Sequence, residues 1–206
     1  TAYDASSEHV ETKAEIEPQL HIVGPTMESL KYNIMDDNLA ELFSNLLVSD
    51  MDAKTQNLCT PAFVKVIEQL SPADAKVFKT IFIACTHREF IAICKVILCK
   101  ASDGTNRIKQ NYIPHFFTEL DVDGLDYDGI SKSIQNLCRL GLLNIDFLHC
   151  FKDDEIYNRI ISNDFVKSLV SWATKSTGED YIANIDSKGL LEYSDFAKDF
   201  AKVCLR

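Results

Sequence analysis

The segment from Asp121 to Gly129 is the part of the sequence whose residue types come nearest to a metal site. Calcium takes several carboxylate oxygens from one short loop, and this segment carries four aspartates. A loop starting at Asp121 puts Asp126 where an EF-hand needs glycine. If Gly129 is aligned with that glycine, Gly124 comes first and Gln135 replaces the closing glutamate. The pattern therefore favours an acidic helix-capping turn over a calcium site.

Histidines and cysteines form the second group that could do chemistry. The nearest groupings are His149 and Cys150 with Cys138, and His87 with Cys94 and Cys99. Zinc sites and thiol–imidazole hydrolases are built from such residues, but the sequence has no CxxC or HxxxH pair. It also lacks the common phosphate-loop, GxSxG and GxGxxG motifs. We therefore expect no catalytic residue, no metal and no cofactor, and we expect that the chain is not an enzyme.

The charge balance bears on nucleic acid binding. The chain has 21 Lys and Arg residues against 31 Asp and Glu residues, a formal net charge of -10 that repels phosphate backbones. A helix expected over 127–140 carries polar side chains that could read bases, but the aspartates described above stand at its leading end. These side chains are Lys132, Gln135, Asn136 and Arg139. The charge disfavours a nucleic acid partner, and a winged-helix DNA-binding regulator is kept as the alternative function.

A protein interaction or assembly module is the preferred function, with a protein partner or a second copy of the chain as the bound molecule. The candidate contact points are the amphipathic helix at 38–48 and the aromatic residues Trp172 and Tyr181. Packing in the core is the competing interpretation for each of them. Whether the chain binds a small molecule is unknown from the sequence.

Cysteine usage and hydropathy bear on the cellular location. The seven cysteines are scattered and odd in number, which favours reduced thiols in a cytoplasmic protein. No window approaches the roughly 18 consecutive apolar residues that a membrane helix needs. We therefore expect a cytoplasmic chain with no membrane segment.

The N-terminal part of the chain must position these residues through helices. We expect a flexible tail over 1–17 and a helical region over 18–70, with helical spacing resuming after Pro25 through Met27, Leu30 and Ile34. The next helix, over 38–48, buries a stripe that consists of Leu39, Leu42, Phe43, Leu46 and Leu47. Thr60-Pro61 and Ser71-Pro72 each predict a helix start, with a capping hydroxyl before a proline at the first helical position.

The remaining residues, 71–206, predict a winged-helix-like domain. Residues 89–99 suit either a buried strand or a buried helix, and the alternation at 143–147 predicts a strand. A helix is inserted at 153–173, and 181–193 form a β-hairpin wing with its turn at 186–189. Ser194 caps a last helix that docks on the core. The fold class is mainly α with a minor α+β component: N-terminal helices, then an elaborated winged-helix-like domain with a small β-hairpin wing.

Four stretches of the sequence together resemble one protein family. They are Leu39 to Leu47, Pro61 to Val64 with Gln69 to Ala75, Leu137 to Leu143, and Tyr193 to Phe200. These stretches resemble the abortive infection alpha (Abi-alpha) family, over roughly residues 30–205. The resemblance implies a bacterial protein, linked by the family's name to phage defence, with no settled biochemical activity and no catalytic residues to carry over.

Overall fold

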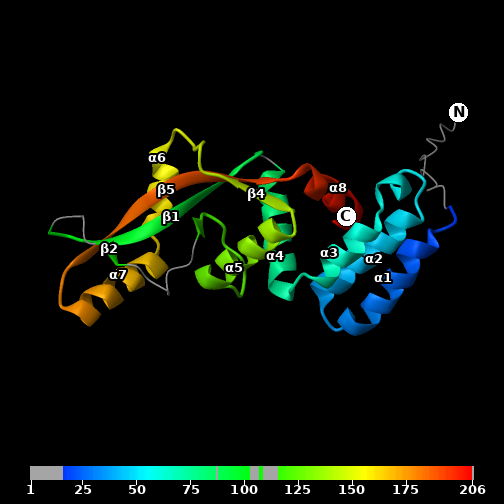
Figure 1. The fold of residues 1–206 in the computed structure, drawn as a ribbon, viewed down its shortest axis with the longest axis horizontal. Helices are drawn as coiled ribbons and strands as arrows, with labels where there is room; N and C mark the ends of the chain where they lie inside the picture. The colour runs from blue at the N-terminus through cyan, green and yellow to red at the C-terminus, as the bar shows by residue number, and fades with distance from the viewer. Residues whose placement is uncertain (1–15, 87, 103–106, 109–115, 206) are drawn as a thin grey trace, which may run out of the picture.

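The computed structural model describes residues 16–86, 88–102, 107–108 and 116–205. These residues form α-helices and a small antiparallel sheet, so the mainly α class with minor β is confirmed. Most of the tail expected over 1–17 lies outside the described residues. Figure 1 shows an elongated molecule, with the N-terminal helices at one end and the sheet reaching toward the other.

The N-terminal helices pack together with the last helix of the chain. They are α1 (Leu20–Asn33), α2 (Asp37–Asp50), the 3-10 helix η1 (Gln56–Leu58), α3 (Pro61–Glu68) and α8 (Asp195–Cys204). Phe63 of α3 meets Phe200 of α8 with ring centroids 5.4 Å apart. Asn45 Nδ2 and Ser49 Oγ of α2 donate to the carbonyls of Cys204 and Val203, at 2.9 and 2.8 Å. The docking of the C-terminal helix is therefore confirmed.

Helix starts follow the predicted chemistry at Ser71 but not at Thr60. Ser71 Oγ accepts from Asp74 N at 3.1 Å, and Asp74 Oδ2 accepts from Ser71 N at 2.8 Å, a reciprocal capping box at the start of α4 (Pro72–Cys85). Thr60 makes no side-chain cap bond, and its buried Oγ1 has no hydrogen-bond partner in the described part of the chain. The proline position at Pro61 is confirmed, whereas the capping role of the Thr60 hydroxyl is wrong.

Two predictions about the other helices are also wrong. The helix expected over 153–173 is two helices, α6 (Asp154–Ile161) and α7 (Asp164–Thr177), because Asn163 Oδ1 accepts from Val166 N at 2.9 Å and starts a new helix. Pro25 lies inside α1 instead of before it. The buried contact of α1 is made by Ile22, while Met27 and Ile34 are exposed.

The segment at 89–99, which the sequence left open between a strand and a helix, forms a strand. Strand β1 (Ile91–Lys100) pairs along its length with β5 (Tyr181–Tyr193). The sheet has the order β2-β1-β5-β4, and β3 also pairs with β1. The three short strands are β2 (Arg107–Ile108), β3 (Phe117–Thr118) and β4 (Leu143–Asp146).

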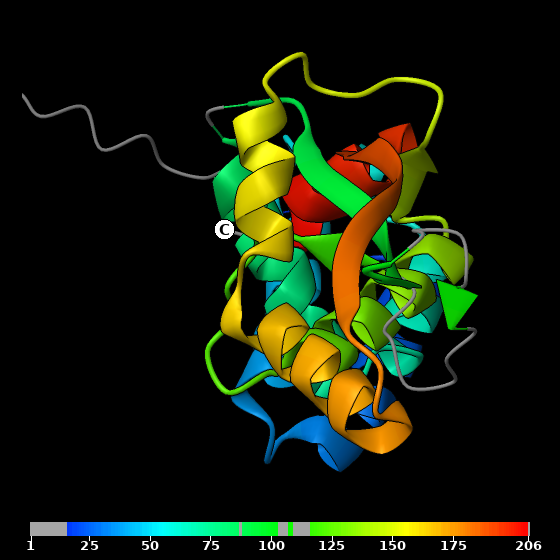
Figure 2. The ribbon, with the colours of Figure 1, turned by 90° about the vertical axis from the view of Figure 1, so that its left-hand side faces the viewer.

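The predicted β-hairpin wing at 181–193 is wrong, because this segment is one antiparallel strand. Its pairing with β1 shifts register between Lys95 and Val96, so that Asp186 is bulged out where a turn was expected. The partner strand lies about ninety residues earlier in the chain, and local spacing carries no information about it. Helices α6 and α7 cover one face of the sheet (Figure 2).

Candidate interaction surface

Two of the side chains expected to read bases hold helices together instead. They lie on α5 (Tyr127–Arg139). Asn136 Nδ2 donates to Asp74 Oδ2 at 2.8 Å and to the carbonyl of Gln69 at 3.2 Å. Arg139 donates from Nε to Asn136 Oδ1 at 2.9 Å and from Nη1 to Gln69 Oε1 at 3.1 Å. Asn136 and Arg139 therefore fix α5 against the junction between α3 and α4.

The other two predicted residues on α5 interact with neighbours on their own helix. Lys132 Nζ lies 2.5 Å from Asp128 Oδ2, and this hydrogen-bonded pair raises the pKa of the lysine. Gln135 Nε2 is 3.5 Å from Ser131 Oγ. Both partners lie within one turn of helix, so these side chains form a solvated helix face with internal partners.

The acidic segment before α5 acts in capping. Asp126 Oδ1 accepts from Gly129 N at 2.8 Å, the N-cap bond of α5. Within the part of the chain that the structure describes, no group of three or more His, Cys, Asp or Glu side chains is arranged to hold a metal ion. His149 Nδ1 lies 2.6 Å from Asp146 Oδ2, whereas His87 lies outside the described residues.

The free thiols are mostly buried. All seven cysteines are unpaired, and burial raises the pKa of Cys94 to about 12 and that of Cys138 to about 11. These two thiols stay protonated at neutral pH, and a protonated thiol is a poor nucleophile. Cys150 is the exposed cysteine. Most of the thiols therefore serve as small apolar side chains of the core.

The expected interaction points differ in exposure. The apolar stripe of α2 is buried, and Tyr181 is 8% exposed beside Leu98 and Ala173. Trp172 on α7 is 48% exposed. The structure does not bring Trp172 together with the predicted residues of α5, because the two sets lie on different helices. Of these interaction points, Trp172 and Val48, which is 47% exposed at the end of the 38–48 helix, leave apolar surface open to solvent.

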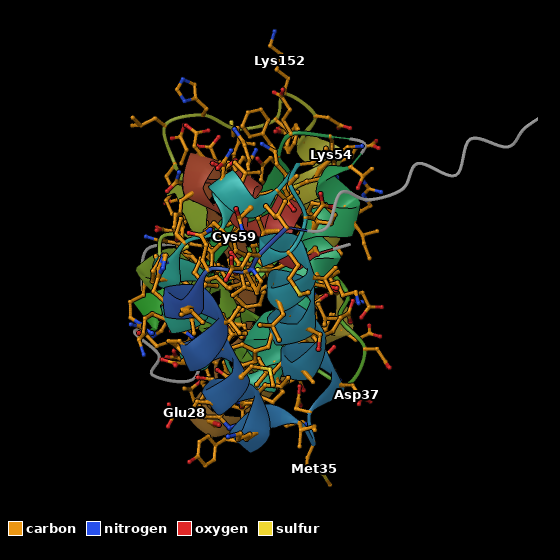
Figure 3. The ribbon with its side chains drawn as sticks, turned by 90° about the vertical axis from the view of Figure 1, so that its right-hand side faces the viewer. Glu28, Met35, Asp37, Lys54, Cys59 and Lys152 are labelled. Carbon is orange, nitrogen blue, oxygen red and sulfur yellow. The ribbon has the colours of Figure 1, made fainter. Side chains whose placement is uncertain are left out.

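A more exposed apolar cluster lies at the end of α1 and in its connection to α2. Tyr32 is 81% exposed, Ile34 is 62% exposed and Met35 is 94% exposed. We name these three residues the α1–α2 tip. Figure 3 shows Met35 at the end of the connection, pointing away from the body of the protein. Large apolar side chains this exposed contribute little to the core, and they are typical of a surface that binds a partner.

The local sequence explains why the tip is exposed. Asp36 caps α2 through a bond from Leu39 N to Oδ1 at 3.0 Å. The residue before an N-cap commonly packs on the fourth residue of the helix, as a hydrophobic staple. Here the residues in question are Met35 and Ala40, and a methyl group offers almost no surface for such packing. This mismatch is a signal that sequence reasoning missed.

A polar hollow of about 530 Å³ adjoins the tip. It lies between α1 and α3, with Tyr32 on its rim. Ser29 Oγ donates to Glu68 Oε1 at 2.6 Å, and Lys65 Nζ lies 2.7 Å from Glu68 Oε2. The hydrogen bonds from Lys65 and Ser29 lower the pKa of Glu68. An apolar centre beside a polar hollow has the composition of a protein–protein interface.

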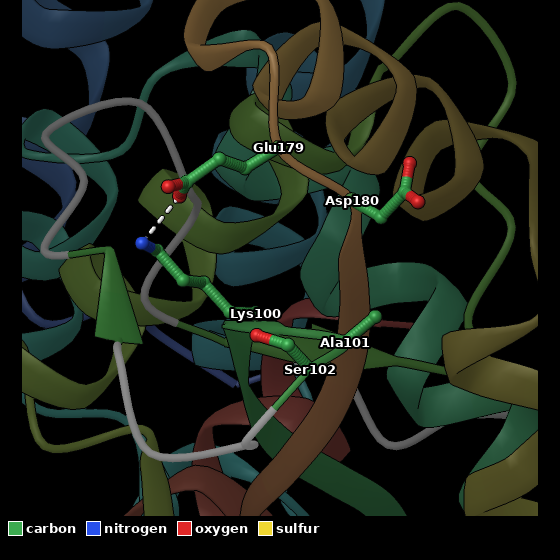
Figure 4. Close-up of a pocket in the computed structure, with 5 residues that line it drawn as sticks. All are labelled: Lys100, Ala101, Ser102, Glu179 and Asp180. Carbon is green, nitrogen blue, oxygen red and sulfur yellow. Dashed lines mark ion pairs between the residues drawn. The ribbon is translucent and has the colours of Figure 1, made fainter.

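A second hollow lies where β1 ends and β5 begins (Figure 4). It encloses about 500 Å³ and is lined by Lys100, Ala101, Ser102, Glu179 and Asp180. Lys100 Nζ lies 2.5 Å from Glu179 Oε2, whereas the Asp180 carboxylate points away from this pair. Lys100 and Glu179 pair with each other, and the described lining residues show no arrangement of side chains for binding a small ligand.

Comparison with known proteins gives one extensive match. The family model described as abortive infection alpha matches residues 3–204. No curated protein matches the chain. A solved structure of an uncharacterized protein from the hydrocarbon-degrading marine bacterium Alcanivorax borkumensis SK2 is similar at 9% identity and a TM-score of 0.38, covering 69% of this chain and 91% of that one.

Among the described residues, no helix is both long and apolar enough to cross a membrane.

Proposed function

Because the chain belongs to the abortive infection alpha family, we propose that it acts in bacterial phage defence as a protein interaction or assembly module, and not as an enzyme. In this proposal the α1–α2 tip is the surface that binds a protein partner. The protein works in the cytoplasm, where its thiols stay reduced.

The single observation that carries the proposal is the exposure of Tyr32 in the last turn of α1 and of Ile34 and Met35 on the short connection to α2. The connection is held by the α2 cap at Asp36, so the tip is presented by a fixed backbone. Burial of apolar surface is worth about 25 cal/mol for each Å². Tyrosine and methionine are also enriched at interfaces. A partner that covers the tip therefore gains affinity without unfolding any part of the core.

The alternative, a winged-helix DNA-binding regulator, has less support. Asn136 and Arg139 would have to leave Asp74 and Gln69 before they could contact bases. Lys132 is paired with Asp128. We expect no mobility shift of mixed-sequence duplexes at low salt. A shift that Lys132→Glu abolishes would favour the DNA-binding alternative over the interaction module.

A phage challenge of bacteria that carry the gene tests the proposal. The double substitution Tyr32→Ser with Met35→Ser should abolish protection, read as plaque counts equal to those of cells without the gene. The matched control is Leu148→Ser, because Leu148 is 92% exposed and lies on the connection after β4, away from the tip. Melting curves of the purified variants should overlay that of the wild type. Full protection by the double variant would overturn the proposed role of the tip.

A further inference from the structure

Strand β5 has one side that no described strand occupies along most of its length. On its other side it pairs with β1 from Tyr181 to Leu191. On the free side, β4 pairs only with Leu190 to Tyr193. The described residues therefore provide no strand neighbour for 181–189 on that side, and Figure 1 shows β5 extending well beyond β4.

A side chain caps the start of this open edge. Tyr181 N donates to Thr174 Oγ1 of α7 at 3.3 Å. Gly189 O accepts from the hydroxyl of Tyr157 on α6 at 3.0 Å. The first bond satisfies the outward-facing N–H of Tyr181 where the edge begins, whereas Gly189 lies opposite Ile93 and faces β1. The middle of the edge has no such cap.

The direction of the middle residues follows from strand alternation. Asp180 O accepts from Ala101 N at 2.8 Å, so Asp180 faces β1 and Tyr181 faces the open side. Ala183 and Ile185 must then direct their N–H and C=O groups to the open side as well. Among the described residues these groups have no hydrogen-bond partner, and both residues are half-buried. They form a short unpaired ladder that another strand can reach.

We propose that this edge pairs, antiparallel, with the same edge of a second copy of the chain, so that one sheet runs through both copies. In this register a two-fold axis passes through Asn184. Ala183 of each copy exchanges two backbone hydrogen bonds with Ile185 of the other, and the two Asn184 side chains lie opposite each other. An unpaired strand edge is a ready template for this kind of pairing.

Charge favours a second copy in this register. The five residues from Tyr181 to Ile185 carry no charged side chain, so two chains of net charge -10 meet without like charges face to face. Antiparallel pairing brings Asp180 of each copy toward the strand end that carries Lys188 of the other. The Asp180 side chain has no partner among the described residues, and Figure 4 shows it pointing away from the Lys100–Glu179 pair. The Lys188 ammonium has three donors, of which Asp154 takes one at 2.6 Å.

The dimer is independent of the proposed phage-defence function and adds to it. The α1–α2 tip belongs to the N-terminal helices, whereas β5 begins at the far end of the sheet, so the two surfaces lie well apart (Figure 1). Pairing through β5 therefore leaves both tips exposed and makes the assembly bivalent toward a partner with repeated sites.

Disulfide trapping of purified full-length protein tests the register directly. In a Cys150→Ser background, which removes the exposed native thiol, Asn184→Cys should give a covalent dimer on oxidation. The two Cα atoms would lie about 4.5 Å apart, within the roughly 4.4 to 6.8 Å that a disulfide spans. Ile182→Cys is the matched control, because its copies would lie about 13 Å apart along the paired strands. Equal cross-linking at both positions, or none at 184, contradicts the proposal.

Sedimentation equilibrium of the unmodified chain provides a second readout. We expect a monomer–dimer equilibrium that shifts toward the dimer as salt screens the net charge. Ala183→Pro should weaken the dimer at least tenfold, since proline removes an outward N–H donor and spares the ladder to β1. Its melting curve at monomeric concentration should match that of the wild type. A single-chain mass for the wild type at every concentration and salt level would overturn the inference.

Discussion

Asp74 joins two stabilising roles in one side chain. Its Oδ2 accepts from Ser71 N within the capping box and from Asn136 Nδ2 across the contact with α5. A carboxylate can accept several hydrogen bonds, so the helix start and the packing of α5 share one acceptor. At the residue scale, polar side chains that the sequence suggests as ligand contacts, such as Asn136, instead form hydrogen bonds between helices of the protein.

The two hydroxyl–proline helix starts give a matched stability prediction. Ser71→Ala should lower the free energy of unfolding by about 1 kcal/mol, because Asp74 N loses its acceptor. Thr60→Val should be neutral or stabilising, since the buried Thr60 hydroxyl has no partner in the described part of the chain. Urea unfolding of both variants provides the measurement. Equal losses at the two sites would contradict the assignment of the caps.

At the element scale, local chemistry predicted the helices well. The caps at Ser71 and Ser194 appear as the sequence indicated, and the apolar stripe of α2 is buried except for the half-buried Leu47. Strand β5 could not be predicted, because its partner β1 is remote in sequence. Residues 186–189 have the composition of a turn, but in the structure they are part of the strand. Asp186 forms a bulge, and Gly189 permits a close approach of the chain after β4.

Replacing each of two glycines by alanine should change the free energy of unfolding in opposite directions. A Cβ at Gly189 would lie 2.7 Å from both Asp146 O and Phe147 Cδ1, so Gly189→Ala should cost roughly 1 to 3 kcal/mol of unfolding free energy. A Cβ at Gly24 would meet nothing within 4 Å. Gly24→Ala should therefore stabilise α1 by roughly 0.5 to 1 kcal/mol. Thermal or urea unfolding distinguishes the two, and a stabilised Gly189→Ala variant would contradict the close approach.

At the scale of the whole molecule, the exposed features lie far apart. The α1–α2 tip belongs to the N-terminal helices, and the open edge of β5 lies toward the far end of the sheet (Figure 1). None of the contact residues predicted from the sequence belongs to the tip; these are Lys132, Gln135, Asn136, Arg139, Trp172 and Tyr181. Ile34 was expected to follow the helical stripe after Pro25, but α1 begins earlier and turns a different face to the core. Exposure depends on tertiary packing, which the spacing of apolar residues did not reveal.

A photo-activated cross-linking side chain placed at Met35 tests the central claim, that the chain works by binding a protein through the α1–α2 tip. In phage-challenged cells the probe at position 35 should give one discrete protein adduct. The same probe at Lys175, an exposed position on α7, should give none. The absence of an adduct at position 35 in cells that remain protected, or the same adduct at both positions, would contradict the account.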